Sequence, residues 1–124
     1  GIDIGPGRNV DIVTPIHLYK PDMQYQTIIS TECFEHDMFL GRSLRRITEL
    51  LSPGGLFLFT CATTGRHEHG TDNHLPHSSP HTRNYYRNVT EMDVRGHMDM
   101  YLFDQYAFEV NQLAKDLYFW GIKA

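Results

Sequence analysis

The chain has 124 residues and a formal net charge of -4, from 11 lysine and arginine residues against 15 acidic ones. This length supports one domain, residues 1–124, with a core that needs neither disulfides nor metal. No run approaches the roughly 18 apolar residues of a membrane span, and no signal peptide is visible. The absence of lysine and arginine clusters argues against nucleic-acid binding. These features predict a small cytoplasmic domain without a membrane or nucleic-acid partner.

Short apolar runs fill the first part of the chain. Residues 1–4 resemble the end of a strand, and a Gly-Pro-Gly turn follows them. A second β-branched run covers residues 10–13. Residues 27–31 form a compact apolar run that is typical of a buried strand.

The strongest helical pattern lies in residues 40–51, where leucine and isoleucine recur at helical spacing. A proline and two glycines at 53–55 end this pattern. Residues 56–62 are apolar without polar alternation, as in a central parallel strand covered on both faces. The middle of the chain therefore predicts a strand, a helix and a strand with a right-handed crossover.

Residues 63–88 show no periodicity and hold five of the eight histidines. A loop of this length is commonly a functional lid or binding loop, and the alternative is a disordered insertion. Tyr85 and Tyr86 near its end favour docking against the rest of the domain.

The last third of the chain predicts a short helix and a hairpin. Thr90 with Asp93 three residues later resembles a capping arrangement. Residues 107–112 and 116–122 are apolar runs joined by a short polar turn, which indicates an antiparallel pair with Trp120 in the core. Strands alternating with a helix and followed by this hairpin predict an α/β fold.

Asp3 is the first candidate for a binding residue. A carboxylate at the carboxyl end of a strand in an open α/β sheet lies at the edge where ligands bind. There it can accept two hydrogen bonds from a ribose diol. The alternative is an aspartate that only caps the following turn.

Two carboxylates and an imidazole follow the strand at 27–31, within the sequence Thr-Glu-Cys-Phe-Glu-His. Glu32 and His36 are candidates for a general base at the same sheet edge. The alternative is a helix N-terminus that carries acidic residues because the helix dipole favours them. Cys33 and Cys61 indicate buried small hydrophobic residues rather than reactive thiols or a disulfide.

Three segments together resemble the class I S-adenosylmethionine-dependent methyltransferases. They are GIDIGPGRNVDIV, YQTIISTECFEH and LRRITELLSPGGLFLFT. The closest likeness is to the broad group with an E-x-x-E-H stretch after the fourth strand. The resemblance implies a truncated Rossmann-like sheet, mostly parallel with a C-terminal antiparallel hairpin, S-adenosylmethionine as cofactor and an unknown methyl acceptor.

The resemblance also implies roles for individual residues. By this resemblance Asp3, which ends the second strand, would hold the ribose hydroxyls of the cofactor. Its neighbour and the segment after the third strand would face the adenine. The end of the fourth strand would line the methionine side of the cofactor. The implied cofactor-binding residues are Asp3, Ile4, Pro15, Ile16 and Thr31.

The chain departs from the family pattern at its start. The family's first strand and its glycine-rich loop precede the second strand, with which this sequence opens. The missing strand lies mid-sheet, between the second and fourth strands. We expect those strands to pair directly, to receive a strand from another chain, or to dock loosely. Exposed edges favour association into a homo-oligomer.

The histidine-rich loop leaves several interpretations open. Arg66, His67 and Arg83 are candidates for a substrate-facing lid, and a solvated loop is the plainer alternative. A His-x-His pattern in a loop fixes no ligand geometry, so no metal site is predicted.

Three functions remain at this point. The first is methyl transfer to an oxygen, nitrogen or carbon acceptor, with His36 or Glu32 as base. The second is a truncated, catalytically silent relative that acts as a binding or assembly module. The third, which the loop pattern favours least, is a metal-binding loop protein.

Overall fold

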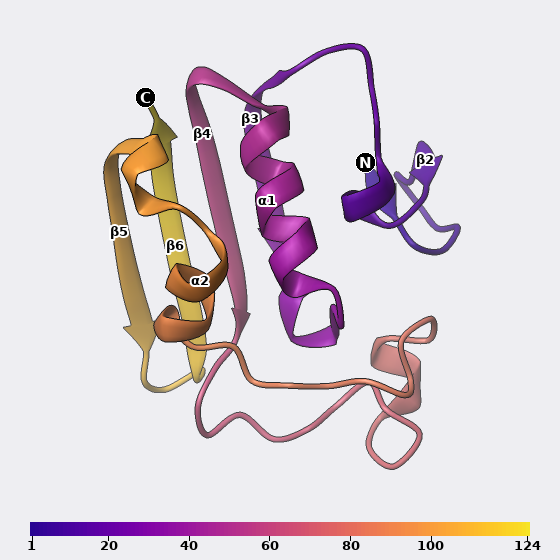
Figure 1. Cartoon of the computed structure of the whole chain (residues 1–124). Coiled ribbons are helices and arrows are strands. Elements are labelled where there is room, and N and C mark those ends of the chain that lie inside the picture. Colours follow the sequence, from indigo (N-terminus) through magenta and orange to yellow (C-terminus); the bar gives the residue numbers. More distant parts are fainter.

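A four-stranded sheet forms the centre of the computed structural model, which describes residues 1–124 (Figure 1). The strands lie in the order β3 (Tyr25–Thr31), β4 (Leu51–Ala62), β6 (Asp116–Lys123) and β5 (Phe103–Asn111). β3 pairs with β4 in parallel, whereas β6 is antiparallel to both neighbours. The predicted hairpin is confirmed, but the expectation of a mostly parallel sheet is wrong. The sheet is mixed because β6 inserts between β4 and β5 and so makes two antiparallel interfaces.

The helix α1 (Leu40–Leu50) connects β3 to β4, as the apolar spacing predicts. Leu44 and Ile47 on its inner side are buried. The residue that ends the helix, Leu51, already begins β4, so this strand starts before the predicted Leu56. The predicted strand, helix and strand are therefore present, with an earlier second strand.

Both α-helices cover the same face of the sheet (Figure 1). Phe57 and Phe59 of β4 and Phe119 of β6 are buried on that face. They belong to one hydrophobic cluster with Val94 of α2 (Glu91–His97). Burial of this apolar surface is the main stabilising contribution to the domain.

The opposite face of the sheet carries an apolar row. By register, Ile29, Leu58, Trp120 and Ala107 lie side by side across the four strands. Ile29 is 63% exposed and Trp120 is 40% exposed. The expectations that β4 is covered on both faces and that Trp120 lies in the core are therefore wrong. The reason is strand alternation, because Trp120 follows the buried Phe119 and points to the other face.

The N-terminal segment forms a small sheet of its own. β1 (Ile2–Asp3) and β2 (Ile12–Val13) pair in parallel and are not hydrogen-bonded to β3. In the family pattern β1 is the second strand and β3 is the fourth. These two strands therefore do not pair directly. After the 3-10 turn η1 (Ile16–Leu18), Arg46 Nε of α1 donates a hydrogen bond to the Tyr19 carbonyl oxygen at 2.7 Å.

The long loop, residues 63–88, contains one short 3-10 turn, η3 (Pro76–Ser78), and otherwise no regular structure. Its own backbone folds back on itself, since the Asp72 N–H donates to the Arg83 carbonyl oxygen at 2.9 Å. The Val89 N–H, just beyond the loop, donates to the carbonyl oxygen of Ala62 at 2.9 Å. The loop is therefore fixed at both of its ends.

The start of α2 confirms the predicted cap. The Thr90 side chain accepts a hydrogen bond from the Asp93 N–H, and the Asp93 side chain accepts one from the Thr90 N–H. Neither α-helix has the length and apolar composition that crossing a membrane requires.

Candidate functional site

The candidate site lies where β3 and β4 end. These strands are parallel, so their carboxyl ends meet at the same edge of the sheet. After Thr31 the chain passes through Glu32, whose φ is +49°, into the 3-10 turn η2 (Phe34–His36). The long loop leaves β4 at this same edge and lies below α1 in Figure 1.

Glu32 presents a half-exposed carboxylate at this edge. Thr60 Oγ1 of β4 donates a hydrogen bond to Glu32 Oε1 at 3.0 Å. Arg66 Nη2 lies 3.9 Å from Glu32 Oε2, and the same guanidinium donates to Asp116. The strand end and the loop are therefore linked through one arginine.

Glu35 is fully buried in η2 and has no cationic partner. Its Oε1 accepts a hydrogen bond from the Ala62 N–H at 3.3 Å, and its Oε2 has none. Burial raises the pKa of Glu35 to about 7, and the negative charge of Glu32 contributes to the rise. The buried carboxyl therefore titrates near neutral pH.

His36 lies under the loop, with 8% of its surface exposed. Its ring meets the rings of His69 and Tyr86 edge-on, at centroid distances of 5.1 Å and 5.6 Å. Its Nδ1 is buried and has no hydrogen-bond partner. Burial lowers the pKa of His36, and the neighbouring His69 lowers it further, which favours the neutral form of the imidazole.

His69 and Tyr86 are the loop residues that complete this cluster. His69 Nδ1 lies 3.0 Å from the His67 carbonyl oxygen, which can only accept, so Nδ1 carries the proton. The Tyr86 hydroxyl donates to Asn88 Oδ1 at 2.6 Å. Burial raises the pKa of Tyr86 to about 12, and the charge of Glu35 adds to this effect.

The N-terminal segment borders the same edge. Asp3 Oδ1 accepts a hydrogen bond from the Gly5 N–H at 2.9 Å, the turn cap that was the alternative interpretation. Burial raises the pKa of the Cys33 thiol, and the charges of Asp37, Glu35 and Asp3 raise it further, although the residue keeps exposed surface. Asp3 therefore acts electrostatically on the segment that follows β3. Cys33, which we expected to be buried, is exposed, and both cysteines are free.

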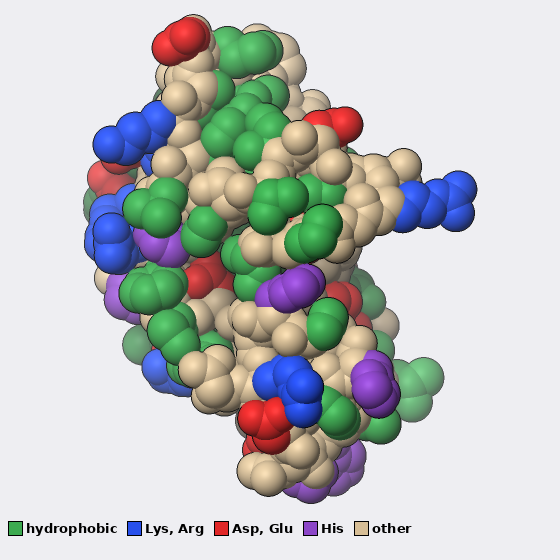
Figure 2. All heavy atoms as spheres, turned by 90° about the vertical axis from the view of Figure 1, so that its right-hand side faces the viewer, with side chains coloured by type: hydrophobic (Ala, Val, Ile, Leu, Met, Phe, Trp, Pro, Cys, Tyr) green, Lys and Arg blue, Asp and Glu red, His purple; other side chains and the backbone are tan.

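The long loop also touches the N-terminal segment. A Cβ placed on Gly5 would lie only 2.0 Å from Nε2 of His81, so the imidazole packs directly on this glycine. Seen from the side, the molecule is hollowed between the N-terminal segment and the loop, and histidine and acidic side chains lie around the hollow (Figure 2).

A separate cavity of about 300 Å³ is lined by residues of η2, the start of α1, α2 and the end of the long loop. Phe34 and Phe39 contribute apolar surface to it, and Arg42, Arg45 and Arg87 contribute positive charge. Since Glu35 and His36 are not among its lining residues, it is distinct from the sheet edge.

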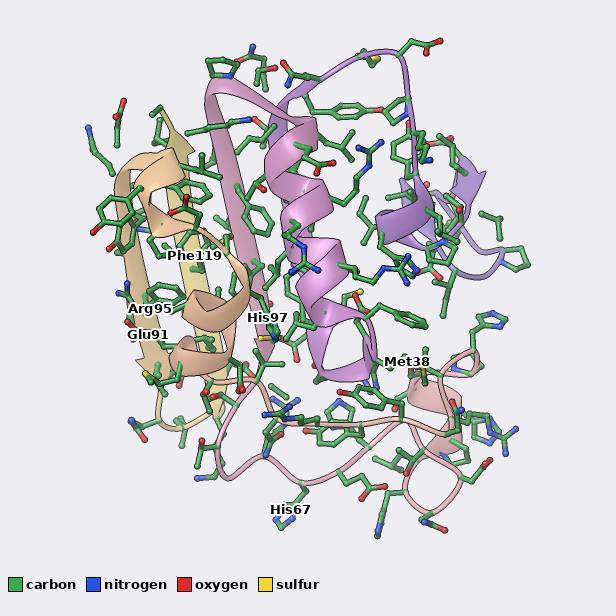
Figure 3. The ribbon with its side chains drawn as sticks, viewed as in Figure 1. Met38, His67, Glu91, Arg95, His97 and Phe119 are labelled. Carbon is green, nitrogen blue, oxygen red and sulfur yellow. The ribbon has the colours of Figure 1, made fainter.

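The structure brings some of the predicted residues together and separates others. Glu32 and Arg66 meet at the sheet edge beside Thr31. His67 points away from the sheet into solvent (Figure 3). Arg83 forms an ion pair with Asp72 on the loop, 2.7 Å apart, rather than reaching the edge.

The other predicted cofactor residues lie in the N-terminal segment. Ile4 is 42% exposed beside Asp3, and Pro15 and Ile16 follow β2 and are partly buried. No site role is predicted from the sequence for Glu35, His69 or Tyr86: Glu35 is only one of two carboxylates after the strand, and His69 belongs to the His-x-His pattern for which no metal site is predicted. In the sequence, only the Glu-His pair after the strand and the His-Glu-His sequence in the loop indicate such a cluster. The contact between these two segments is long-range, so local patterns do not predict it.

Comparison with solved structures identifies the fold. The N-methyltransferase NodS of Bradyrhizobium japonicum WM9, in complex with S-adenosyl-L-homocysteine, has a TM-score of 0.61 at 13% identity, over 98% of this chain and 64% of that one. The 1,6-didemethyltoxoflavin-N1-methyltransferase of Burkholderia thailandensis, with S-adenosylhomocysteine bound, gives 0.61 at 17% identity, over 99% and 60%. The phosphoethanolamine N-methyltransferase 2 of Haemonchus contortus gives 0.62 at 15% identity, over 92% and 37%.

No family model matches the chain, and no curated protein matches it by sequence. The chain spans less than two thirds of each of these three solved methyltransferases. At this identity the likeness concerns the fold alone. The chain has the fold of the S-adenosylmethionine-dependent methyltransferases.

Proposed function

We propose that this chain binds S-adenosylmethionine and takes part in methyl transfer to an oxygen, nitrogen or carbon acceptor. The observation that carries the proposal is the position of Asp3 at the end of β1, where the Gly5 N–H engages only one of the two carboxylate oxygens. The solved neighbours with S-adenosylhomocysteine bound support the choice of cofactor. We keep the cytoplasm as the predicted location.

The proposed cofactor site follows the carboxyl ends of the strands. Asp3 uses one oxygen for the Gly5 N–H, and the other oxygen has no such bond and can accept from a ribose hydroxyl. Ile4, Pro15 and Ile16 offer apolar surface for the adenine. Thr31 at the end of β3 would line the methionine side.

The reaction is an in-line displacement. The acceptor's lone pair attacks the methyl carbon, the carbon–sulfur bond breaks, and S-adenosylhomocysteine leaves with the bond's electrons. Positioning of the two reactants supplies most of the catalysis. An acceptor that carries a proton must lose it to a base, and we propose Glu32 or His36 for this role.

The two candidate bases differ in access. Glu32 is half-exposed and hydrogen-bonded to Thr60, so a substrate can reach it directly. His36 has a lowered pKa, which favours its neutral form, but it is covered by the loop and so needs the loop to open. Of the proposed substrate-loop residues, Arg66 contacts the edge, whereas His67 and Arg83 would act only on an acceptor that extends over the loop.

Calorimetric titration of the chain with S-adenosylmethionine and S-adenosylhomocysteine tests the proposal. We expect binding that is lost in Asp3→Ala and kept in Asp22→Ala, which removes an exposed aspartate of the linker before β3. Equal binding by both variants would place the cofactor elsewhere. No binding at millimolar ligand by a folded chain would remove the proposal for this chain.

A catalytically silent assembly module is the second candidate. The unpaired edge of β3 favours it, because β1 and β2 form their own sheet and leave the β3 backbone groups free to pair with another strand. A homo-oligomer formed through this edge would have a concentration-dependent mass in light scattering. A monomer at all concentrations, with cofactor bound, would exclude this candidate.

A further inference from the structure

We propose that Glu35, His36 and His69 form a binding site for a divalent transition-metal ion of the zinc class. One potential ligand atom from each of these residues lies within 4.8 Å of the others. The site joins the turn after β3 to the long loop. This proposal does not depend on the proposed methyl transfer and is tested separately.

The first argument is the uncompensated burial of Glu35. A buried carboxylate in a protein is normally paired with a cation or bound to a metal. Glu35 is fully buried, yet no lysine or arginine forms an ion pair with it. Arg66 is engaged by Glu32 and Asp116 instead, and the Arg87 guanidinium by Asp93. A metal ion would supply the positive charge that the site lacks.

The second argument is the set of free lone pairs. The buried side-chain atoms without a hydrogen-bond partner include Glu35 Oε2 and His36 Nδ1, which belong to adjacent residues. Leaving such atoms unsatisfied is costly, so natural proteins contain few of them. Two such atoms, in residues that each place a potential ligand atom within 4.8 Å of the others, are accounted for by a shared ion.

The third argument is the tautomer of His69. Its Nδ1 donates to the His67 carbonyl oxygen, so in the neutral imidazole the lone pair is on Nε2 and is available to an ion. A histidine that binds a metal through one nitrogen usually donates the other N–H to a carbonyl or carboxylate in this way. The hydrogen bond of His69 Nδ1 is therefore compatible with metal binding through Nε2.

The donor set determines the kind of ion. Two imidazoles and one carboxylate suit zinc, cobalt or iron(II), whereas magnesium and calcium prefer oxygen donors. Bonds of roughly 2.0–2.2 Å require ligand atoms about 3–4 Å apart, so small side-chain rotations would close the site. Three protein ligands leave at least one coordination position for water or another ligand.

Nearby groups are consistent with a cation. Glu32 acts by its charge on Glu35. Tyr86 is subject to the negative charges of Glu32 and Glu68 and to the positive charge of Arg66, so acidic side chains outnumber basic ones around the cluster. Gly70 permits the close approach of the loop, because a Cβ there would lie 2.8 Å from His36 Cε1. With an ion bound, the His36 lone pair is occupied, which leaves Glu32 as the base of the proposed methyl transfer.

The test titrates the full chain, treated with a chelator and desalted, with Zn²⁺ by calorimetry and with Co²⁺ by absorption. We expect one ion per chain and a Co²⁺ spectrum of low coordination number. Glu35→Gln and His69→Ala should each weaken Zn²⁺ binding by at least about tenfold, since changes to groups behind the ligands already cost that much. His69 lies on a loop, so its variant tests the site even if a change at His36 disturbs folding.

His74→Ala is the matched control. His74 is an exposed histidine of the same loop and lies outside the cluster, so its variant should bind Zn²⁺ like the unchanged chain. Unaltered Zn²⁺ affinity in Glu35→Gln and His69→Ala, or loss of binding in His74→Ala alone, would overturn the proposal. Failure of the folded chain to bind either ion would overturn it as well.

Discussion

The four-stranded sheet and the N-terminal segment are stabilised in different ways. The sheet has three strand pairings and a cluster of buried phenylalanines that both helices cover. The segment before β3 has two strands of two residues each, and no residue of those strands is buried. It is attached mainly through η1 and Tyr19 to α1. The proposed cofactor site therefore combines one rigid side with one weakly held side.

Removing the Phe119 side chain should have the largest effect on the sheet. Phe119 is 1% exposed, and its ring contacts those of Phe57, Phe59, Phe103 and Phe108 (Figure 3). Phe119→Ala should lower the free energy of unfolding by about 3–5 kcal/mol, as buried phenylalanine deletions do. Equilibrium unfolding in urea measures this loss.

The controls for that experiment come from the same protein. Phe119→Leu should cost less because it leaves a smaller cavity, and it serves where the alanine variant fails to fold. Tyr101→Ala, at a side chain that is 96% exposed, should be nearly neutral. A loss below 1 kcal/mol in Phe119→Ala would mean that the phenylalanine cluster does not explain why the sheet is more stable than the N-terminal segment.

The cap of α2 should have an intermediate effect. Burial alone would raise the pKa of Asp93, but hydrogen bonds from Thr90 and the charge of Arg87 lower it overall. Its contribution to stability is therefore complete above the unfolded pKa and is lost as the pH falls through the lower folded pKa. Asp93→Asn should cost about 0.5–2 kcal/mol at pH 7. The difference from the unchanged chain should shrink in acid, which urea unfolding at pH 7 and at pH 3 would reveal.

Most of the elements could be predicted because their signals are local. The helical spacing of Leu44 and Ile47 and the cap at Thr90 lie within a few residues of each other and need no tertiary context. The mixed sheet could not be predicted from these signals, because it depends on β6 inserting between two other strands. Trp120 was misplaced for a related reason, since the hairpin's register decides which face each residue takes.

The candidate site was predicted only in part. Glu32 and His36 are predicted at this edge because they directly follow a predicted buried strand, and their catalytic role stays a prediction. His69 lies in a loop without periodicity, and nothing local indicates that it meets His36. Such contacts are decided by how the loop folds, which short-range patterns do not encode.

Loosening the N-terminal segment should have a small global effect and a clear local one. Arg46 donates to the Tyr19 carbonyl oxygen and pairs with the exposed Glu49, so Arg46→Ala removes one attachment of the segment. We expect a loss of about 1 kcal/mol or less in unfolding free energy. Amide exchange of residues 10–19 should become faster, while exchange in β4 stays unchanged. Equal acceleration in both regions would show that the segment unfolds only together with the sheet.

The smallest effect on stability should come from an exposed polar contact on α2, one of the helices that cover the sheet. Glu91 and Arg95 form an exposed ion pair one helical turn apart, at 2.8 Å, and Arg95 also covers the Phe108 ring (Figure 3). Glu91→Gln should change the unfolding free energy by about 0.5 kcal/mol or less, because water screens the pair and Arg95 keeps its aromatic contact. High salt should reduce even this difference. A loss of unfolding free energy as large as that of Phe119→Ala would contradict our comparison. Burial would then no longer explain which contacts stabilise the domain.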